Sequence, residues 1–291
     1  MTVSQIQEIS GKVKESGVVL VNDVLNSEQF KLANNILKNV HNNQSKKGDA
    51  QGYFPVYLKN IIIKLLKFEF GKLKKSFLLK KMAKDLQLKK IAEKIFDHEA
   101  ELHMLDSYYS EKSDKFILPW HNDIGYHDGK FHGKSMKEDD YYAASITTIN
   151  LKRTNAAGRG IKFLIHMTDV ESENGCFSLI PYSHHIVKAI TSLILEKKIK
   201  LKSYWGLEDL RALVLKSSVK DLIIDRVGVE KLNIFLNNSK FIKHGTKDTF
   251  KFDCKMNKGG AVIFDELAVH RGSAPNKHGR LILRYLYHRK I

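Results

Sequence analysis

The sequence predicts a mainly β domain, a sandwich or barrel decorated with α-helices. Three observations support this prediction. From about Leu102 onward, short β-prone runs alternate with clusters of Gly, Asn, Asp and Ser, and no regular series of helices separates them. Helix-like patterns are concentrated in the N-terminal third and in one later stretch. The 291 residues are 43% hydrophobic and 28% charged, which allows a sizeable core and excludes fibrous and fully disordered proteins.

The N-terminal part, residues 17–100, is expected to contain a strand followed by helices. Residues 17–24 (GVVLVNDV) have the composition of a strand. Asn26 and Gln29 then stand three positions apart, which is the spacing of a capping box at the start of a helix. In the range 57–96, apolar residues recur every three or four positions with lysines between them, as is typical of amphipathic helices.

The β-prone runs form the predicted core, at residues 102–185 and 255–291. A lysine-rich, helix-like stretch at 186–222 interrupts them and is interpreted as a helical insertion. No repeat or low-complexity linker divides the chain, so we expect one domain over residues 1–291. The clearest strand candidates are residues 143–151, 161–167, 176–180, 260–264 and 281–287.

The chain is strongly basic, with a net charge of +17. Such an excess suits anionic partners, including nucleic acid, phosphorylated metabolites, thioesters or an anionic membrane surface. However, arginine supplies only 8 of the 49 basic residues. Sequence-specific nucleic-acid readers rely on arginine, whereas lysines commonly form the solvated faces of helices. We therefore expect a small-molecule substrate, for which an anionic group would suit the surface, rather than nucleic acid.

The sequence also predicts a cytoplasmic protein without a membrane span. No run approaches the roughly 20 apolar residues that a spanning helix needs. The N-terminal MTVSQIQEISGK lacks the basic, apolar and small-residue pattern of a secretory signal. Cys176 and Cys254 lack CxxC spacing, which indicates reduced thiols that fill the core.

Three residues suggest a metal centre. Among thirteen histidines about 1.4 His-x-Asp/Glu triplets are expected by chance, so the single match, His121-Asn122-Asp123, is a weak signal alone. A later histidine, His270, closes a β-prone run. Two histidines and one carboxylate form the facial triad that holds non-haem Fe(II) and leaves coordination positions open. The competing interpretation is that His121 and His270 are ordinary, partly buried histidines.

The flanks of these residues resemble the phytanoyl-CoA dioxygenase family. PWHND at residues 119–123 is similar to its W-H-x-D iron motif, and residues 17–29 resemble its N-terminal strand and helix. Residues 167–185 (MTDVESENGCFSLIPYSHH) resemble its Glu-Asn-Gly and Pro-Gly-Ser-His segment, with Tyr182 where the family usually has glycine. Residues 270–280 (HRGSAPNKHGR) resemble its distal-histidine segment. The four motifs occur in the family's order.

The resemblance implies a double-stranded β-helix, a jelly-roll or cupin-like barrel, that acts as an Fe(II)- and 2-oxoglutarate-dependent dioxygenase. His121, Asp123 and His270 would bind Fe(II), which the co-substrate 2-oxoglutarate would chelate before O2 binds. Such an enzyme hydroxylates its substrate and releases succinate and CO2; desaturation or ring closure is the alternative outcome. Related halogenases carry Gly or Ala in place of the carboxylate, so Asp123 favours hydroxylation.

The far carboxylate of 2-oxoglutarate requires a bidentate cationic partner, which arginine supplies better than lysine. Arg280 is the preferred anchor because it lies nearer His270, and Arg284, on the same face of the predicted strand, is its competitor. By resemblance, Thr147 and Asn150 are further candidates for contact with the co-substrate.

Several other residues carry weaker expectations. Ser183 and His184 match the family's Ser-His pair, with turn capping as the equal alternative. His127 and His132 are candidates for the substrate entrance, and His166 is expected to be a core histidine with its hydrogen bonds satisfied rather than a ligand.

Two further functions remain open on the sequence. In one, the same fold acts on a macromolecule, nucleic acid or protein, with lysine runs following phosphates. In the other, the chain is a binding module without catalysis.

Overall fold

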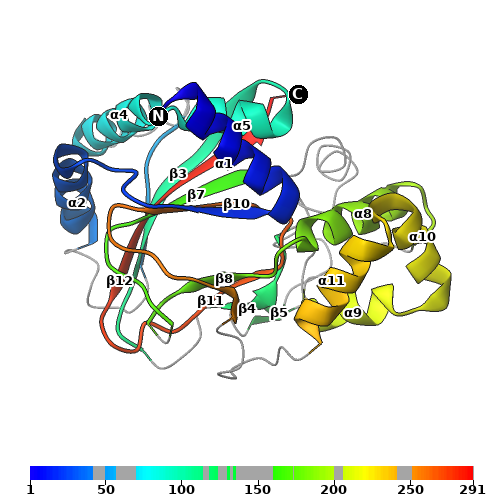
Figure 1. Cartoon of the computed structure of the whole chain (residues 1–291). Helices are drawn as coiled ribbons and strands as arrows, with labels where there is room; N and C mark the ends of the chain where they lie inside the picture. Colours follow the sequence, from blue (N-terminus) through cyan, green and yellow to red (C-terminus); the bar gives the residue numbers. More distant parts are fainter. Residues whose placement is uncertain are drawn as a thin grey trace.

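The computed structural model describes residues 1–41, 50–56, 70–113, 118–123, 130–131, 134–135, 160–172, 174–199, 206–240 and 251–290. Its centre is formed by two β-sheets that face each other (Figure 1). The larger sheet has six strands in the order β1-β10-β7-β12-β3-β2, and the smaller has four in the order β4-β11-β8-β9. The named strand pairs of both sheets are all antiparallel. This arrangement confirms the predicted double-stranded β-helix.

The strands of the larger sheet come from widely separated parts of the chain. They are β1 Val18–Val21, β10 Ala261–Asp265, β7 Ile161–His166, β12 Arg280–Arg289, β3 Ala100–Ser110 and β2 Ala50–Tyr53. The smaller sheet contains β4 Leu118–His121, β11 His270–Gly272, β8 Phe177–Leu179 and β9 Asp253–Cys254. A separate hairpin pairs β5 Lys130–Phe131 with β6 Lys134–Ser135.

The helices α1, α2, α4 and α5 lie on the outer side of the larger sheet (Figure 1). Their bounds are Val3–Ser16, Ser27–His41, Phe70–Asp85 and Leu88–Phe96. Alternation along the strands divides the side chains between two layers: Phe163 and Ile165 of β7 pack with the helices, whereas Leu164 packs between the sheets. The inner layer also includes both cysteines, which are buried free thiols.

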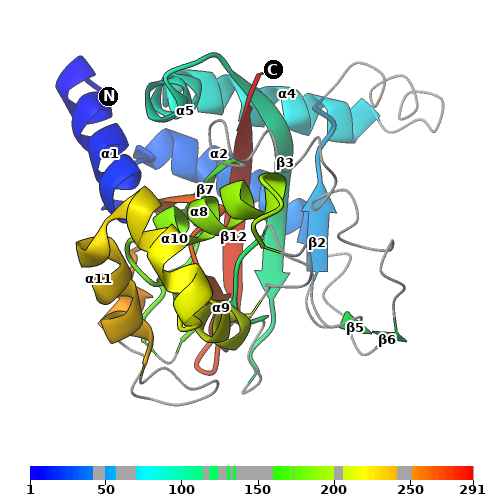
Figure 2. The same ribbon diagram turned by 90° about the vertical axis from the view of Figure 1, so that its right-hand side faces the viewer.

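Four more helices form a second, helical layer beside the smaller sheet (Figures 1 and 2). They are α8 Ser183–Leu195, α9 Leu207–Val214, α10 Ser217–Val227 and α11 Val229–Ser239. The helices in this part of the chain therefore continue to Ser239, past the expected limit at residue 222. Their shared core includes Trp120 and Val269, the residues that precede His121 and His270. The helical layer thus packs directly on the two strands that carry these histidines.

The structure can be compared with the elements that local sequence patterns predicted. Asn26 and Gln29 form the reciprocal capping hydrogen bonds, at 2.9 and 3.1 Å, at the start of α2. The predicted helical range 57–96 lies partly outside the described residues, and its described part is two helices separated at Gln87, which has a φ of 58°. The predicted strand at 143–151 lies outside the described residues.

Among the described residues, none of the helices combines the length and apolar character needed to cross a bilayer.

Candidate metal centre

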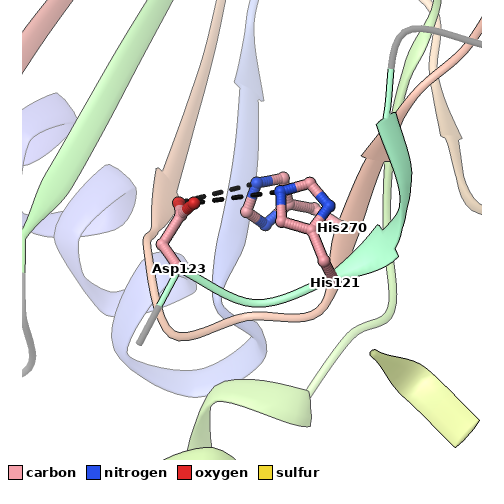
Figure 3. Close-up of side chains that lie close together, drawn as sticks. All are labelled: His121, Asp123 and His270. Atoms are coloured by element: carbon pink, nitrogen blue, oxygen red, sulfur yellow. Dashed lines mark ion pairs between the residues drawn. The ribbon is translucent and has the colours of Figure 1, made fainter. Parts of the chain in front are cut away.

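His121, Asp123 and His270 converge at one end of the smaller sheet (Figure 3). His121 ends β4 and His270 begins β11, and the two residues are directly opposite each other in the antiparallel pair. Their ring centroids are 4.4 Å apart. Asp123 follows two residues after His121 and directs its carboxylate toward both imidazoles. Strand pairing therefore brings together residues that are about 150 positions apart in the sequence.

The spacing of the three side chains fits a single metal ion. The Nε2 atom of His121 lies 3.8 Å from Oδ1 of Asp123, and the Nε2 atom of His270 lies 3.6 Å from Oδ2. Two donors that each bind a divalent ion at about 2.1 Å can be at most about 4.2 Å apart. Both distances, one to each carboxylate oxygen, satisfy this limit. One donor atom from each residue can be chosen so that all three lie within 4.8 Å of one another, so a side-chain movement of less than about 1 Å would bring the set to one ion.

The local surroundings orient His270 as a metal ligand. Its Nδ1 atom lies 2.8 Å from the carbonyl oxygen of Ala268, which favours a proton on Nδ1 and leaves Nε2 to face Asp123. Burial, followed by the proximity of His121, lowers the pKa of His270 to about 3. The imidazole is therefore neutral at physiological pH, which is the protonation state that binds metals.

A buried lysine holds Asp123 in place. The Nζ atom of Lys162, on β7, lies 2.6 Å from Oδ2 of Asp123 and 3.1 Å from Oε1 of Glu266. Burial raises the pKa of Asp123, but its polar and charged neighbours, the positive Lys162 first among them, outweigh burial and hold this pKa below its usual range. Neither Lys162 nor Glu266 was predicted from the sequence as part of the site. The available signal was a lysine on the inward face of a mostly apolar strand, IKFLIH.

The two candidate arginines differ in their partners. Arg284 donates two hydrogen bonds to the buried carboxylate of Asp106, at 2.8 and 2.6 Å. Gln51 donates to the same carboxylate and to the hydroxyl of Tyr108. A bidentate pair of this kind occupies the guanidinium and compensates its charge. Arg280, by contrast, donates to the carbonyl oxygen of Gly175 at 2.7 Å and contacts the Ser110 hydroxyl at 3.5 Å. The ion pair with Asp106 therefore disfavours Arg284 as the anchor for an added carboxylate.

The Asn-Gly turn fixes the position of Arg280. The Oδ1 atom of Asn174 accepts hydrogen bonds from the backbone N–H groups of Lys277 and His278, just before β12 begins. Gly175 has a φ of +73°, and a Cβ at this position would lie 3.1 Å from Cδ of Arg280. The turn therefore needs glycine both for its backbone conformation and for its close approach to Arg280.

The other predicted residues have different outcomes. Thr147, Asn150, His127 and His132 lie outside the described residues. Ser183 joins α8 to the metal centre, because its hydroxyl donates to the Ile180 carbonyl and accepts from the N–H of Val269, next to His270. The Nε2 atom of His184 lies 3.2 Å from the Lys14 carbonyl oxygen, in a contact with α1.

Comparison with known proteins identifies the family. The family model described as phytanoyl-CoA dioxygenase (PhyH) matches residues 13–280, a range that includes the three converging residues and Arg280. The chain therefore belongs to the phytanoyl-CoA dioxygenase family. No curated protein sequence matches the chain.

Solved structures share the fold at low sequence identity. The epimerase SnoN, solved with Fe3+, alpha-ketoglutarate and nogalamycin RO, has a TM-score of 0.53 and 11% identity over 99% of this chain and 85% of its own. HygX from Streptomyces hygroscopicus, solved with nickel and 2-oxoglutarate, has a TM-score of 0.52 and 14% identity over 100% of this chain and 88% of its own. The carbocyclase SnoK from nogalamycin biosynthesis has a TM-score of 0.52 and 12% identity over 97% of this chain and 83% of its own.

Proposed function

We propose that this chain is an Fe(II)- and 2-oxoglutarate-dependent dioxygenase that hydroxylates a small molecule. The observation that carries the proposal is the convergence of His121, Asp123 and His270 with donor spacings that fit one ion. Membership of the phytanoyl-CoA dioxygenase family supports the same reaction class. The similar structures solved with an iron or nickel ion and the 2-oxo acid support it further.

The proposed roles of the residues follow from their positions. The two imidazoles and the Asp123 carboxylate bind Fe(II), while Lys162 holds one carboxylate oxygen and balances its charge. Arg280 is proposed to bind the far carboxylate of 2-oxoglutarate. Thr147 and Asn150, which lie outside the described residues, are further proposed contacts on the family resemblance alone. When bound, Fe(II) would provide the oxidising chemistry: with 2-oxoglutarate and O2, a substrate C–H bond is oxidised and succinate and CO2 are released.

The substrate is proposed to be a small molecule, and an anionic group would suit the basic chain. SnoN, an epimerase, was solved with the small molecule nogalamycin RO, and SnoK is a carbocyclase. Hydroxylation is therefore one of several outcomes within this fold, and analysis of the oxidised product decides between them. We also infer a cytoplasmic location, supported by two buried cysteines that remain free thiols.

Coupled turnover tests the proposal. With Fe(II) and 2-oxoglutarate, the wild-type chain should consume O2 and release an equal amount of succinate. His121→Ala, Asp123→Ala and His270→Ala should each lose this activity and bind Mn(II) at least tenfold more weakly. His185→Ala removes an imidazole outside the centre and should retain both properties. Full iron-dependent turnover in the triad variants would show that these residues do not form the centre.

A further inference from the structure

His166 is a buried imidazole inside the barrel that the proposed metal centre does not use. It ends β7 on the same face as Leu164, which packs between the two sheets, and it is directly opposite Ile282 of β12. Its side chain is completely buried. The interior position is thus fixed by strand register rather than by the conformation of a loop.

The polar atoms of His166 lack protein partners. Neither ring nitrogen has a hydrogen-bond partner within the part of the chain that the structure describes. Burial, and then the positive charge of Arg280, lower the pKa of His166 to about 3. The ring is therefore neutral at physiological pH and offers one N–H donor and one acceptor. A buried polar group without partners destabilises a fold, so it indicates a ligand that supplies them.

The strand register places His166 at the other end of β7 from Lys162, the residue that contacts Asp123. Lys162, which contacts Asp123, pairs with Leu286, whereas His166 pairs with Ile282. Four residues of strand separate the two pairs, or roughly 13 Å along the sheet. Arg280 lies on the same face of β12, one further step of two residues from the centre. A diacid held by the metal at one end would extend its other end toward these two side chains.

We propose that His166 and Arg280 together bind the distal carboxylate of the 2-oxo diacid, so that His166 selects diacid over monoacid co-substrates. This inference rests on the proposed function. The His166 N–H donates to one carboxylate oxygen, and the guanidinium of Arg280 supplies the opposite charge. A purely structural role would not explain a histidine at position 166, because leucine would fill the same space without leaving a polar group unsatisfied.

Binding measurements without turnover test this role. The anaerobic protein is loaded with Mn(II), and the Kd is measured by calorimetry for 2-oxoglutarate and for 2-oxopentanoate, which replaces the distal carboxylate with a methyl group. His166→Leu should weaken 2-oxoglutarate binding about tenfold or more and leave 2-oxopentanoate binding unchanged. His166→Gln keeps an N–H donor and should remain within a few-fold of the wild type.

Two controls separate this role from a structural one. The unfolding free energy of the ligand-free protein should not fall in His166→Leu, because the substitution removes an unsatisfied buried group. His41→Leu alters another buried imidazole, one that contacts Ser107, and should leave the Kd for 2-oxoglutarate unchanged.

Equal 2-oxoglutarate affinity in wild type and His166→Leu would overturn the inference, as would an equal loss for both ligands. If either result is obtained and the wild type still binds 2-oxoglutarate only in the presence of Mn(II), the proposed function stands and only the role of His166 is rejected. If the wild type itself does not bind 2-oxoglutarate in the presence of Mn(II), the proposed function and this inference both fail.

Discussion

At the scale of single residues, the main feature is a lysine between two carboxylates, one buried and one largely buried. Lys162 contacts both Asp123 and Glu266, and all three side chains are at most 16% exposed. These three charged side chains stabilise one another only when all are present, because removing one leaves the others uncompensated in an interior that solvates charge poorly. A metal ion bound by Asp123 would supply part of the positive charge that Lys162 provides in its absence.

Lys162→Met keeps the length of the side chain and removes its charge. We expect the metal-free protein to lose about 3 kcal/mol or more of unfolding free energy, and Mn(II) to restore part of it. Denaturant unfolding with and without Mn(II) measures both effects.

Lys290→Met is the matched control, because Lys290 forms an exposed pair with Glu99 and should lose at most about 1 kcal/mol. An equal loss in the two variants would show that the buried set has no special role.

The residues that the sequence identified and those that it missed differ in a physical way. His121, Asp123 and His270 were predictable as a candidate set because metal chemistry restricts the residue types and the spacing of the first two. Lys162, Glu266 and the partners of Arg284 were not, because their contacts depend on the register of β7, β3 and β12. Register is a property of the folded sheets that no short motif encodes.

At the scale of elements, the turn from β8 into α8 departs from the family pattern at Tyr182. This residue has a φ of +66°, the left-handed conformation that glycine adopts easily and that aromatic residues adopt at a cost. The backbone shape expected for a glycine is therefore retained with a tyrosine in its place. The turn matters because Ser183, the next residue, bonds to the backbone next to His270.

Comparison of Tyr182→Gly with Tyr182→Ala isolates this strain. Both variants remove the ring, but only glycine removes the Cβ that disfavours a positive φ. We expect Tyr182→Gly to be more stable than Tyr182→Ala by about 1 kcal/mol in thermal or denaturant unfolding. A Gly variant that is less stable than the Ala variant would contradict a strained turn.

The accuracy of the predicted elements follows the strength of their local signals. The strands at 161–167 and 281–287 and the capping box at Asn26 were confirmed, because alternation and capping are local properties. Helix α1 was not predicted, although Thr2 and Gln5 form a capping box and Ile6, Ile9 and Val13 share its buried face. Strands β4 and β11 have only four and three residues, too few for a periodic pattern.

At the scale of the whole molecule, two sheets place the metal centre between a helical layer and the barrel interior. The core of α8–α11 includes Trp120 and Val269, so the helices pack against the outer side of the metal-bearing strands. Composition and strand pattern predicted a β sandwich or barrel, and the family resemblance specified the double-stranded β-helix. The sheet order could not be derived from the pattern alone, because pairing between distant strands depends on long-range packing.

The net charge of +17 also belongs to the whole molecule. If the substrate is a small molecule, DNA or RNA added at low salt should leave the rate of 2-oxoglutarate turnover unchanged. Any nucleic-acid binding should weaken with increasing salt, because lysine–phosphate contacts release counterions. Succinate release measured with and without nucleic acid tests this expectation. A clear stimulation of turnover would support a macromolecular substrate instead.

The central claim is that His121, Asp123 and His270 share one metal ion. An anaerobic crystal structure with Mn(II) and 2-oxoglutarate tests it most directly. We predict an ion about 2.1 Å from Nε2 of each histidine and from one oxygen of Asp123, with the distal carboxylate of 2-oxoglutarate on Arg280. An ion bound elsewhere, or imidazoles directed away from it, would contradict the account.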